Sequence, residues 1–251
     1  MNPKLAELRK KAMALPLSPG VYLMKNADGQ IIYIGKAKML KNRVSQYFGS
    51  QNHHNAKVRR MVANVDHFDY ILTDSEFEAL VLECSLIKLH TPKYNILLKD
   101  DKGYSYIRIS PPPYSRITVA FQKEDDGARY IGPYTSSWVV KQSVDEAVRA
   151  FRLPTCSRRF PQDIGRARPC LNASIRLCCA PRRRGAMSAA EYQEVVDEAV
   201  QFLTGSSAQS IRILTQKMEQ AAEELQFERA AQLRDRISAL KRLGERQTVV
   251  S

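Results

Sequence analysis

The sequence PGVYLMKNADGQIIYIGKAK, residues 19–38, determines the fold of the first part of the chain. Two apolar, β-prone runs flank Asn26-Ala27-Asp28-Gly29, and an Asp-Gly pair between apolar strands predicts a β-hairpin. We expect a two-residue turn at Ala27-Asp28 or at Asp28-Gly29. Because side chains alternate along a strand with period two, either turn places Tyr22 and Tyr33 on the same sheet face.

Three further elements are predicted to complete this region. Residues 39–48 have apolar side chains at helical spacing, and a helix there makes Arg43 and Tyr47 neighbours, four residues apart. A third strand is expected at 66–72. Ser75-Glu76-Phe77-Glu78 is typical of a capping box, so Ser75 should open a helix that ends near Thr91-Pro92. That helix carries Glu83 among apolar residues, a placement that needs a functional or structural reason.

The rest of the chain indicates strands, then helices. Strands are expected at 104–109 and 117–121, separated by three prolines, and a helix at 136–151. A second helix should run from Ser188 to Gly205. Apolar stripes over 211–243 predict a helical hairpin that turns near 225–227. The fold class is therefore α+β: a small domain with an antiparallel sheet flanked by helices, a mixed linker region, and a mostly helical carboxyl-terminal part.

Several segments together resemble the GIY-YIG nuclease domain of the UvrC family, a subunit of the bacterial UvrABC excision nuclease. They are Pro19-Gly20-Val21-Tyr22, Tyr33-Ile34-Gly35-Lys36-Ala37-Lys38, Arg43, Leu82-Glu83 and Pro92-Lys93-Tyr94-Asn95. The resemblance extends over nearly the whole chain and implies five parts. These are a GIY-YIG endonuclease domain (1–96), a β-strand and helix connecting region (97–151), a basic cysteine-rich segment (152–187), a helix (188–206) and a UVR hairpin (207–245).

The resemblance also implies roles for the residues of the nuclease domain. Tyr33 would be the general base on the attacking water with Tyr22 beside it, and Glu83 would hold one divalent metal, Mg²⁺ or Mn²⁺. Lys36 and Arg43 would hold the scissile phosphate, and Tyr47 and Asn95 would complete the site. A phenol with a pKa of about 10 is a weak base at neutral pH, so nearby cations would have to lower that pKa.

Each of these residues also has an ordinary structural interpretation. Tyr22 and Tyr33 could be half-buried strand residues, the cations could be surface charges, and Asn95 could be a turn former. Glu83 could be a solvated or ion-paired helix residue. Their joint order and spacing favour the nuclease.

The charge balance points to nucleic acid as a partner. The 251 residues carry a net charge of +13, with a pI of about 9.6, and a basic protein of this kind favours a polyanion. Nine arginines and one aspartate lie between 151 and 185. A basic linker is the alternative to phosphate contact there. The DNA-binding candidates are Lys38, Arg158, Arg159, Arg166 and Arg168.

The sequence favours a cytoplasmic protein without membrane contact. No apolar run approaches the roughly 18 residues of a membrane span, and the basic start lacks a signal-peptide core.

Four of the five cysteines cluster in the basic segment. Cys156, Cys170, Cys178 and Cys179 resemble the cysteine-rich segment of UvrC, which implies a 4Fe-4S cluster. The pattern departs from the family because Arg182 stands where its last cysteine follows Ala-Pro. Cys179 could substitute, but vicinal cysteines seldom reach two corners of one cluster, so a degenerate or three-ligand site competes. Cys84 is expected in the core, and His53-His54 in a solvated loop rather than at a metal.

Residues 227–235 resemble the UVR motif, through which UvrC contacts UvrB. The implied UvrB-binding residues are Phe227, Ala230, Ala231, Arg234 and Asp235. Because two helices alone expose much apolar surface, the hairpin is expected to pair with a partner hairpin. An intramolecular or self-pairing hairpin is the alternative.

The resemblance implies a metal-dependent DNA endonuclease of nucleotide excision repair that is recruited by UvrB and makes the 3′ incision. The RNase H-like and helix-hairpin-helix domains that follow the UVR hairpin in the family are not in these 251 residues. Two other interpretations stay open: a non-catalytic adaptor that binds UvrB and DNA, and a stand-alone backup 3′ nuclease similar to Cho.

Overall fold

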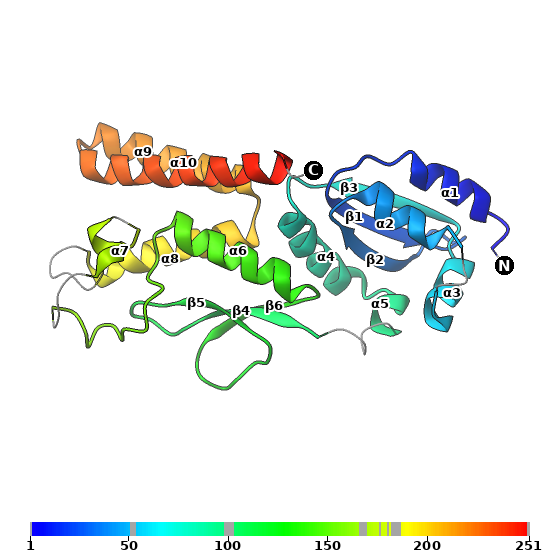
Figure 1. The fold of residues 1–251 in the computed structure, drawn as a ribbon, viewed down its shortest axis with the longest axis horizontal. Coiled ribbons are helices and arrows are strands. Elements are labelled where there is room, and N and C mark those ends of the chain that lie inside the picture. The colour runs from blue at the N-terminus through cyan, green and yellow to red at the C-terminus, as the bar shows by residue number, and fades with distance from the viewer. Residues whose placement is uncertain are drawn as a thin grey trace. The chain divides into compact units, whose positions relative to one another are not determined.

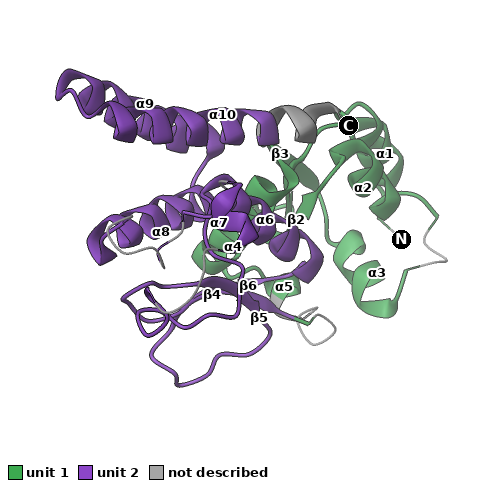
Figure 2. Ribbon diagram, turned by 60° about the vertical axis from the view of Figure 1, so that its left-hand side comes forward, with its two compact units in different colours: residues 1–103, 246–251 green, residues 104–245 purple. Residues whose placement is uncertain are grey.

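The computed structural model describes residues 2–50, 54–97, 103–165, 170–175, 177–179, 181 and 187–249. The chain divides into two compact units (Figure 2). Unit 1 comprises Met1–Gly103 with Arg246–Ser251, and unit 2 comprises Tyr104–Glu245. Among helices in the described ranges, none combines the length and the apolar character that crossing a membrane requires.

Unit 1 contains a three-stranded antiparallel sheet with strand order β2-β1-β3, flanked by helices (Figure 1). Its elements in chain order are α1 (Leu5–Met13), β1 (Gly20–Lys25), β2 (Ile31–Ala37), α2 (Leu40–Tyr47), α3 (Ala56–Ala63), β3 (His67–Leu72), α4 (Glu76–His90) and α5 (Lys93–Leu97). The predicted helix, third strand and Ser75-initiated helix are α2, β3 and α4.

Strand alternation divides the core of unit 1 into two layers. Tyr22, Met24 and Tyr33 share one sheet face and pack with buried residues of α1, α2 and α3. Val21, Leu23 and Ile34 lie on the other face and pack with residues of α4. The predicted common face of Tyr22 and Tyr33 is confirmed, since Tyr22 pairs with Gly35 and Met24 with Tyr33.

The prediction of a two-residue turn in this hairpin is wrong. The Gly29 N–H donates to the Asn26 carbonyl, and the Asn26 N–H donates to the Gln30 carbonyl, so the loop contains three residues. Gly29 has φ +77°, a conformation that glycine adopts without steric cost. An irregularity between Met24 and Lys25 then shifts the register by one residue, and this shift keeps both tyrosines on one face.

Helix α4 begins at the predicted cap and ends at a left-handed residue. The Ser75 hydroxyl accepts the Glu78 N–H at 3.0 Å, whereas the Glu78 carboxylate accepts from Asp74 rather than from Ser75. Only half of the expected capping box is therefore present. Thr91, with φ 42°, terminates the helix, and Pro92 cannot continue it.

Unit 2 is built on a second antiparallel sheet with strand order β5-β4-β6. Its elements are β4 (Ser105–Ile109), β5 (Ile117–Ala120), β6 (Arg129–Tyr134), α6 (Ser137–Ala150), α7 (Leu171–Ser174), α8 (Ala189–Thr204), α9 (Ser207–Glu223) and, as far as Glu245, α10 (Phe227–Val249). Helix α6 packs on β4, β5 and α8. Strand β6 was not predicted from sequence, because Gly132-Pro133 interrupts its strand pattern. The α+β fold class and the final helical hairpin are confirmed.

The α9–α10 hairpin packs on α8 within the chain. Leu214, Leu233, Ile237 and Leu240 are buried, so this apolar stripe is covered within the chain, and the pairing with a partner hairpin stays a prediction. Helix α9 begins four residues before the expected start, because the Ser206 hydroxyl accepts the Gln209 N–H.

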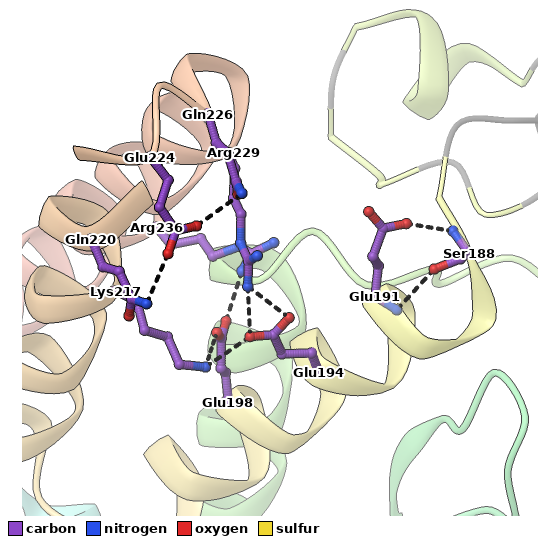
Figure 3. A network of polar contacts seen from close by, with 10 residues as sticks. All are labelled: Ser188, Glu191, Glu194, Glu198, Lys217, Gln220, Glu224, Gln226, Arg229 and Arg236. Carbon is purple, nitrogen blue, oxygen red and sulfur yellow. Dashed lines mark hydrogen bonds and ion pairs between the residues drawn. The ribbon is translucent and has the colours of Figure 1, made fainter. Parts of the chain in front are cut away.

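Five charged side chains join the hairpin to α8 (Figure 3). Glu198 of α8 contacts Lys217 of α9 at 2.9 Å and Arg236 of α10 at 2.7 Å. Glu194 of α8 contacts Lys217 at 3.0 Å and Arg229 at 3.1 Å. The Glu198 side chain is 6% exposed, which makes it the centre of this cluster. At the start of α8, which the sequence predicted at Ser188, Ser188 and Glu191 form a complete capping box.

Candidate active site

Three buried tyrosines from three elements meet on one side of the sheet in unit 1. Tyr22 comes from β1, Tyr33 from β2 and Tyr47 from the end of α2, and their exposed fractions are 1%, 5% and 7%. Their ring centroids are 5.8 to 6.1 Å apart. The phenol oxygens of Tyr22 and Tyr47 lie 3.0 Å apart, and Tyr47 donates to Tyr33 over 3.5 Å. Two residues predicted from the hairpin and one from the helix therefore share one hydrogen-bonded cluster.

Gly35 makes room for the first of these phenols. A Cβ atom at Gly35 would lie 2.2 Å from the Tyr22 hydroxyl oxygen and 2.4 Å from the ring carbon that carries it. Tyr22 and Gly35 are direct cross-strand partners, so the Tyr22 ring lies across the glycine. The glycine is therefore required by a close approach, and any larger side chain would displace the phenol.

The outer edge of β2 is paired with side chains in place of another strand. The amide of Asn95 accepts the Ile34 N–H and donates to the Ile34 carbonyl, both at 2.8 Å. Two residues further along, the Lys36 N–H donates to a carboxylate oxygen of Glu83 at 3.0 Å. Glu83 is 4% exposed. These contacts answer why α4 carries a buried carboxylate: it satisfies the strand edge beside the tyrosines.

Two cations flank this part of the sheet: Arg43 lies on the face of the tyrosines, and Lys36 lies on the face that packs with α4. The Arg43 guanidinium stands over the Tyr47 ring at 5.4 Å from its centroid, as the helical spacing predicted. The Lys36 ammonium forms an ion pair with Glu76 in the first turn of α4. Sequence reasoning did not identify Glu76. Its spacing of seven residues from Glu83, two helical turns on the same face, is the signal that could have found it.

Burial controls the protonation of the tyrosines. It raises the pKa of both Tyr22 and Tyr33 well above the usual value, and the neighbouring Tyr47 phenol adds to this rise. Arg43 acts in the opposite direction on both phenols. Burial disfavours the charged Arg43 guanidinium, but the phenol groups of Tyr47 and Tyr22 outweigh this and raise its pKa. The guanidinium is thus a permanent positive charge, and burial favours the protonated phenols of Tyr22 and Tyr33.

His54 lies closer to the cluster than the sequence indicated. Its ring stacks on Tyr47 with centroids 6.2 Å apart and an interplanar angle of 20°. Its Nε2 atom lies 3.1 Å from the Gln46 carbonyl oxygen. The expected solvated loop histidine is therefore packed against an aromatic ring, whereas His53 lies outside the described residues.

The predicted cysteine cluster is not preformed. All four cysteines are described, yet within the described ranges no three His, Cys, Asp or Glu side chains are arranged to hold a metal. Cys178 and Cys179 contact each other, and this contact, with burial, raises the pKa of the Cys179 thiol. The thiols of Cys178 and Cys179 therefore interact with each other. The described cysteines do not converge on one site, and the cluster implied by the resemblance stays a prediction.

Part of the backbone of the basic segment (152–187) is held by hydrogen bonds within unit 2. Arg116, next to β5, donates to the carbonyl oxygens of Cys156 and Arg158, and the Arg159 N–H donates to Asp163 at 2.8 Å. Lys38 and Arg159 are exposed, whereas Arg158 is half-buried. Arg166 and Arg168 lie outside the described residues.

The UVR residues differ in exposure along α10. Phe227 is 67% exposed, Ala230 and Ala231 are half-buried and Arg234 is exposed. Asp235 forms ion pairs with Arg234 and with Arg152, each at 3.2 Å. Four of the five predicted UvrB-binding residues therefore form one stripe along the helix, and Asp235 is already engaged within the chain.

Sequence comparison gives three matches in chain order. Residues 18–96 match the UvrC-like GIY-YIG domain, 104–202 the UvrC/Cho excinuclease middle domain, and 208–243 the UvrB/uvrC motif. UvrABC system protein C of Acetivibrio thermocellus is 47% identical over 246 residues, which are 98% of this chain and 39% of that protein. The same protein of Ruminiclostridium cellulolyticum is 47% identical over 245 residues, 97% of this chain and 40% of that protein.

A solved structure is also similar to the first part of the chain. It is the GIY-YIG N-terminal endonuclease domain of UvrC from Thermotoga maritima bound to magnesium, with 44% identity and a TM-score of 0.33, covering 38% of this chain and 99% of that one. The chain spans about 40% of the length of the curated relatives that it matches. Since all three successive regions match parts of one kind of protein, the chain belongs to the UvrC family.

Proposed function

We propose that this chain is a metal-dependent DNA endonuclease of nucleotide excision repair that makes the 3′ incision at lesions. The supporting observation is the convergence of Tyr22, Tyr33 and Tyr47 beside Arg43, next to a strand edge that carries Glu83. These groups supply a proton acceptor, a phosphate-binding cation and an oxygen ligand within one site. Hydrolysis of a phosphodiester needs all three.

Glu83 is the proposed metal ligand. Its carboxylate is buried, is held by the Lys36 N–H and offers the hard oxygen donors that Mg²⁺ and Mn²⁺ prefer. Mg²⁺ keeps several waters and commonly takes only one or two protein carboxylates, so a single glutamate fits it. When bound, the metal would supply Lewis-acid stabilisation of charge on the phosphate oxygens.

Tyr33 is the proposed general base, and its surroundings determine whether its phenol is protonated or ionised. Burial keeps its phenol protonated in the isolated chain, while Arg43 favours the phenolate. Arg43 and Lys36 would bind the scissile phosphate and hold it against Tyr33. Asn95 would fix the β2 backbone, so that Tyr33 and Lys36 keep their relative positions on either side of Ile34.

We further propose that UvrB binds the open stripe of α10 and that the protein acts in the cytoplasm. The stripe of Phe227, Ala230, Ala231 and Arg234 exposes one aromatic ring beside two small residues and a cation. Aromatic and arginine side chains are frequent anchors in protein interfaces. The five-part division of the chain made from its sequence is retained as part of this proposal.

The test is incision of a lesion-containing duplex that is already nicked on the 5′ side and loaded with UvrB, in Mg²⁺. Tyr33→Phe and Glu83→Gln should each lower the incision rate about 10²-fold or more, because each removes a group that acts in the transition state. Tyr70→Phe is the matched control, since Tyr70 is a strand tyrosine that is 42% exposed. A wild-type chain that binds UvrB and DNA but never cuts would contradict the nuclease and favour the adaptor.

A further inference from the structure

A groove in unit 1 lies along β2 next to the candidate active site. It has a volume of about 630 Å³. Its walls include Gln30, Ile31 and Ile32 at the start of β2, Asn64 after α3, and His90 and Lys93 on either side of the α4–α5 connection. We call this cavity the edge groove.

Residues that line the edge groove are sequence neighbours of active-site residues. Ile32 directly precedes Tyr33, and Lys93 and Tyr94, which also line the groove, precede Asn95. Asn95 in turn holds Ile34, between Tyr33 and Gly35. The groove is therefore lined by residues of the same strand, β2, and of the same α5 segment that carry Tyr33 and Asn95.

The chemistry of the lining suits a nucleic-acid backbone. Lys93 and His90 are exposed and supply cationic or hydrogen-bonding groups, and amide side chains come from Asn26, Gln30 and Asn64. Of the described residues that line the groove, none is acidic. Cations and amides are the groups that contact phosphate and sugar without reading sequence.

The walls of the groove are held in place before any ligand arrives. The Asn64 amide donates to the Tyr94 hydroxyl at 3.1 Å and to the Arg60 carbonyl at 2.7 Å. The Asn26 side chain accepts the Gln30 N–H at 2.8 Å. Such preorganisation lowers the entropic cost of binding.

We propose that the edge groove binds the DNA strand that flanks the scissile phosphate, with Lys93 as its main phosphate contact. This inference rests on the proposed nuclease function. Ile31 lies two residues from Tyr33, about 7 Å along the strand, and Lys36 lies about 16 Å from Ile31. Since successive phosphates advance by about 3.4 Å along a duplex, the groove would hold phosphates roughly two to five steps from the cut.

The experiment compares wild type with Lys93→Gln and His90→Gln. Binding of the full chain to a pre-nicked duplex is measured in EDTA, with single phosphates replaced in turn by neutral methylphosphonate. Lys10→Gln is the matched control, because Lys10 is an exposed cation of α1 outside the groove. Unchanged thermal unfolding of each variant shows that the fold is retained.

In wild type, we expect one or two neutral phosphates, about two to five positions from the cut, to weaken binding about 3- to 10-fold. Lys93→Gln should weaken binding to the unmodified duplex by a similar factor, lose this sensitivity and reduce the slope of log K against log salt by about one. Lys10→Gln should keep the wild-type interference pattern. Weaker binding of His90→Gln at the same positions would define the second contact.

The inference is overturned if Lys93→Gln keeps the wild-type pattern, or if no DNA binding is detected. Failure of the proposed function is a separate outcome. A chain that never incises, but whose Lys93-dependent phosphate contact appears in the binding assay, would support DNA binding in the edge groove and contradict the proposed nuclease function.

Discussion

At the scale of single residues, the site depends on the space that Gly35 leaves for Tyr22. Gly35→Ala should lower the incision rate at least about 10²-fold, because the new methyl group would displace the phenol from its hydrogen bond with Tyr47. The free energy of unfolding should fall by only about 1 to 3 kcal/mol, since the clash is with the end of one side chain.

Two other glycines are the controls for that change. A Cβ at Gly20 would lie 2.4 Å from the Ile71 carbonyl oxygen, so Gly20→Ala should affect folding more than Gly35→Ala does. At Gly49 the nearest atoms are 3.6 Å away, and Gly49→Ala should be tolerated. Urea unfolding and incision rates measured together would separate the three cases. A Gly35→Ala chain with wild-type incision would contradict the close-approach argument.

The buried tyrosines also predict how stability depends on alkaline pH. Burial raises the pKa of Tyr22 in the folded state, so the folded chain keeps this proton at a pH where the unfolded chain, with a tyrosine pKa of about 10, loses it. The contribution is therefore complete below pH 10 and is lost as pH rises above it. Tyr22→Phe should flatten the fall in urea midpoint between about pH 9 and 11, whereas Tyr70→Phe, at an exposed position, should not.

The candidate residues could be predicted because their order and spacing are local properties of the sequence. Tyr22, Tyr33, Arg43 and Tyr47 come together through one hairpin and the helix that follows it. The ion pair between Lys36 and Glu76 and the stacking of His54 on Tyr47 could not be predicted, because they depend on how α4 and the loop before α3 pack in space.

At the scale of elements, the charged cluster between α8 and the hairpin fixes the orientation of α9 and α10. Glu198→Gln should destabilise unit 2 by about 1 to 3 kcal/mol, since it weakens charge-assisted hydrogen bonds to Lys217 and Arg236. Asp197→Asn on the same helix is the control. Asp197 is exposed, and its replacement should change stability by less than about 0.5 kcal/mol.

The same cluster should weaken in acid. Burial alone would raise the pKa of Glu194, but Lys217 and Arg229 lower it overall. Because the folded pKa lies below the unfolded value of about 4.3, this stabilisation is present above that pH and is lost as pH falls below it. Urea unfolding of unit 2 at pH 3 and 6 measures the effect. If the urea midpoint is the same at pH 3 as at pH 6, both in wild type and in Glu198→Gln, the cluster's role is contradicted.

The elements were predictable where caps and periodicity agreed. Ser75 and Ser188 mark the starts of α4 and α8, and the apolar stripe of 136–151 corresponds to α6. Strand β6 was missed because a strand that contains Gly132 and Pro133 has neither the usual composition nor the usual pattern. The turn at 27–29 was placed one residue too short because the register shift at Met24 and Lys25 has no sequence signature.

At the scale of the whole molecule, each unit has its own sheet and its own core. We expect a fragment of residues 1–103 to fold alone and to unfold cooperatively in urea, as judged by circular dichroism. A fragment ending at residue 90 should be markedly less stable, because it lacks buried Tyr94 and the Asn95 amide that holds β2. Equal stability of the two fragments would show that α5 contributes nothing to the fold.

The Asn95 amide has a consequence for the protein in concentrated solution. Strand β2 stands at the margin of its sheet, where free N–H and C=O groups invite a strand from another molecule. One carboxamide occupies both groups of Ile34, and a carboxylate occupies the next N–H. Asn95 and Glu83 thereby also protect the strand against edge-to-edge aggregation. Substitutions that remove these two side chains from the candidate active site would remove this protection as well.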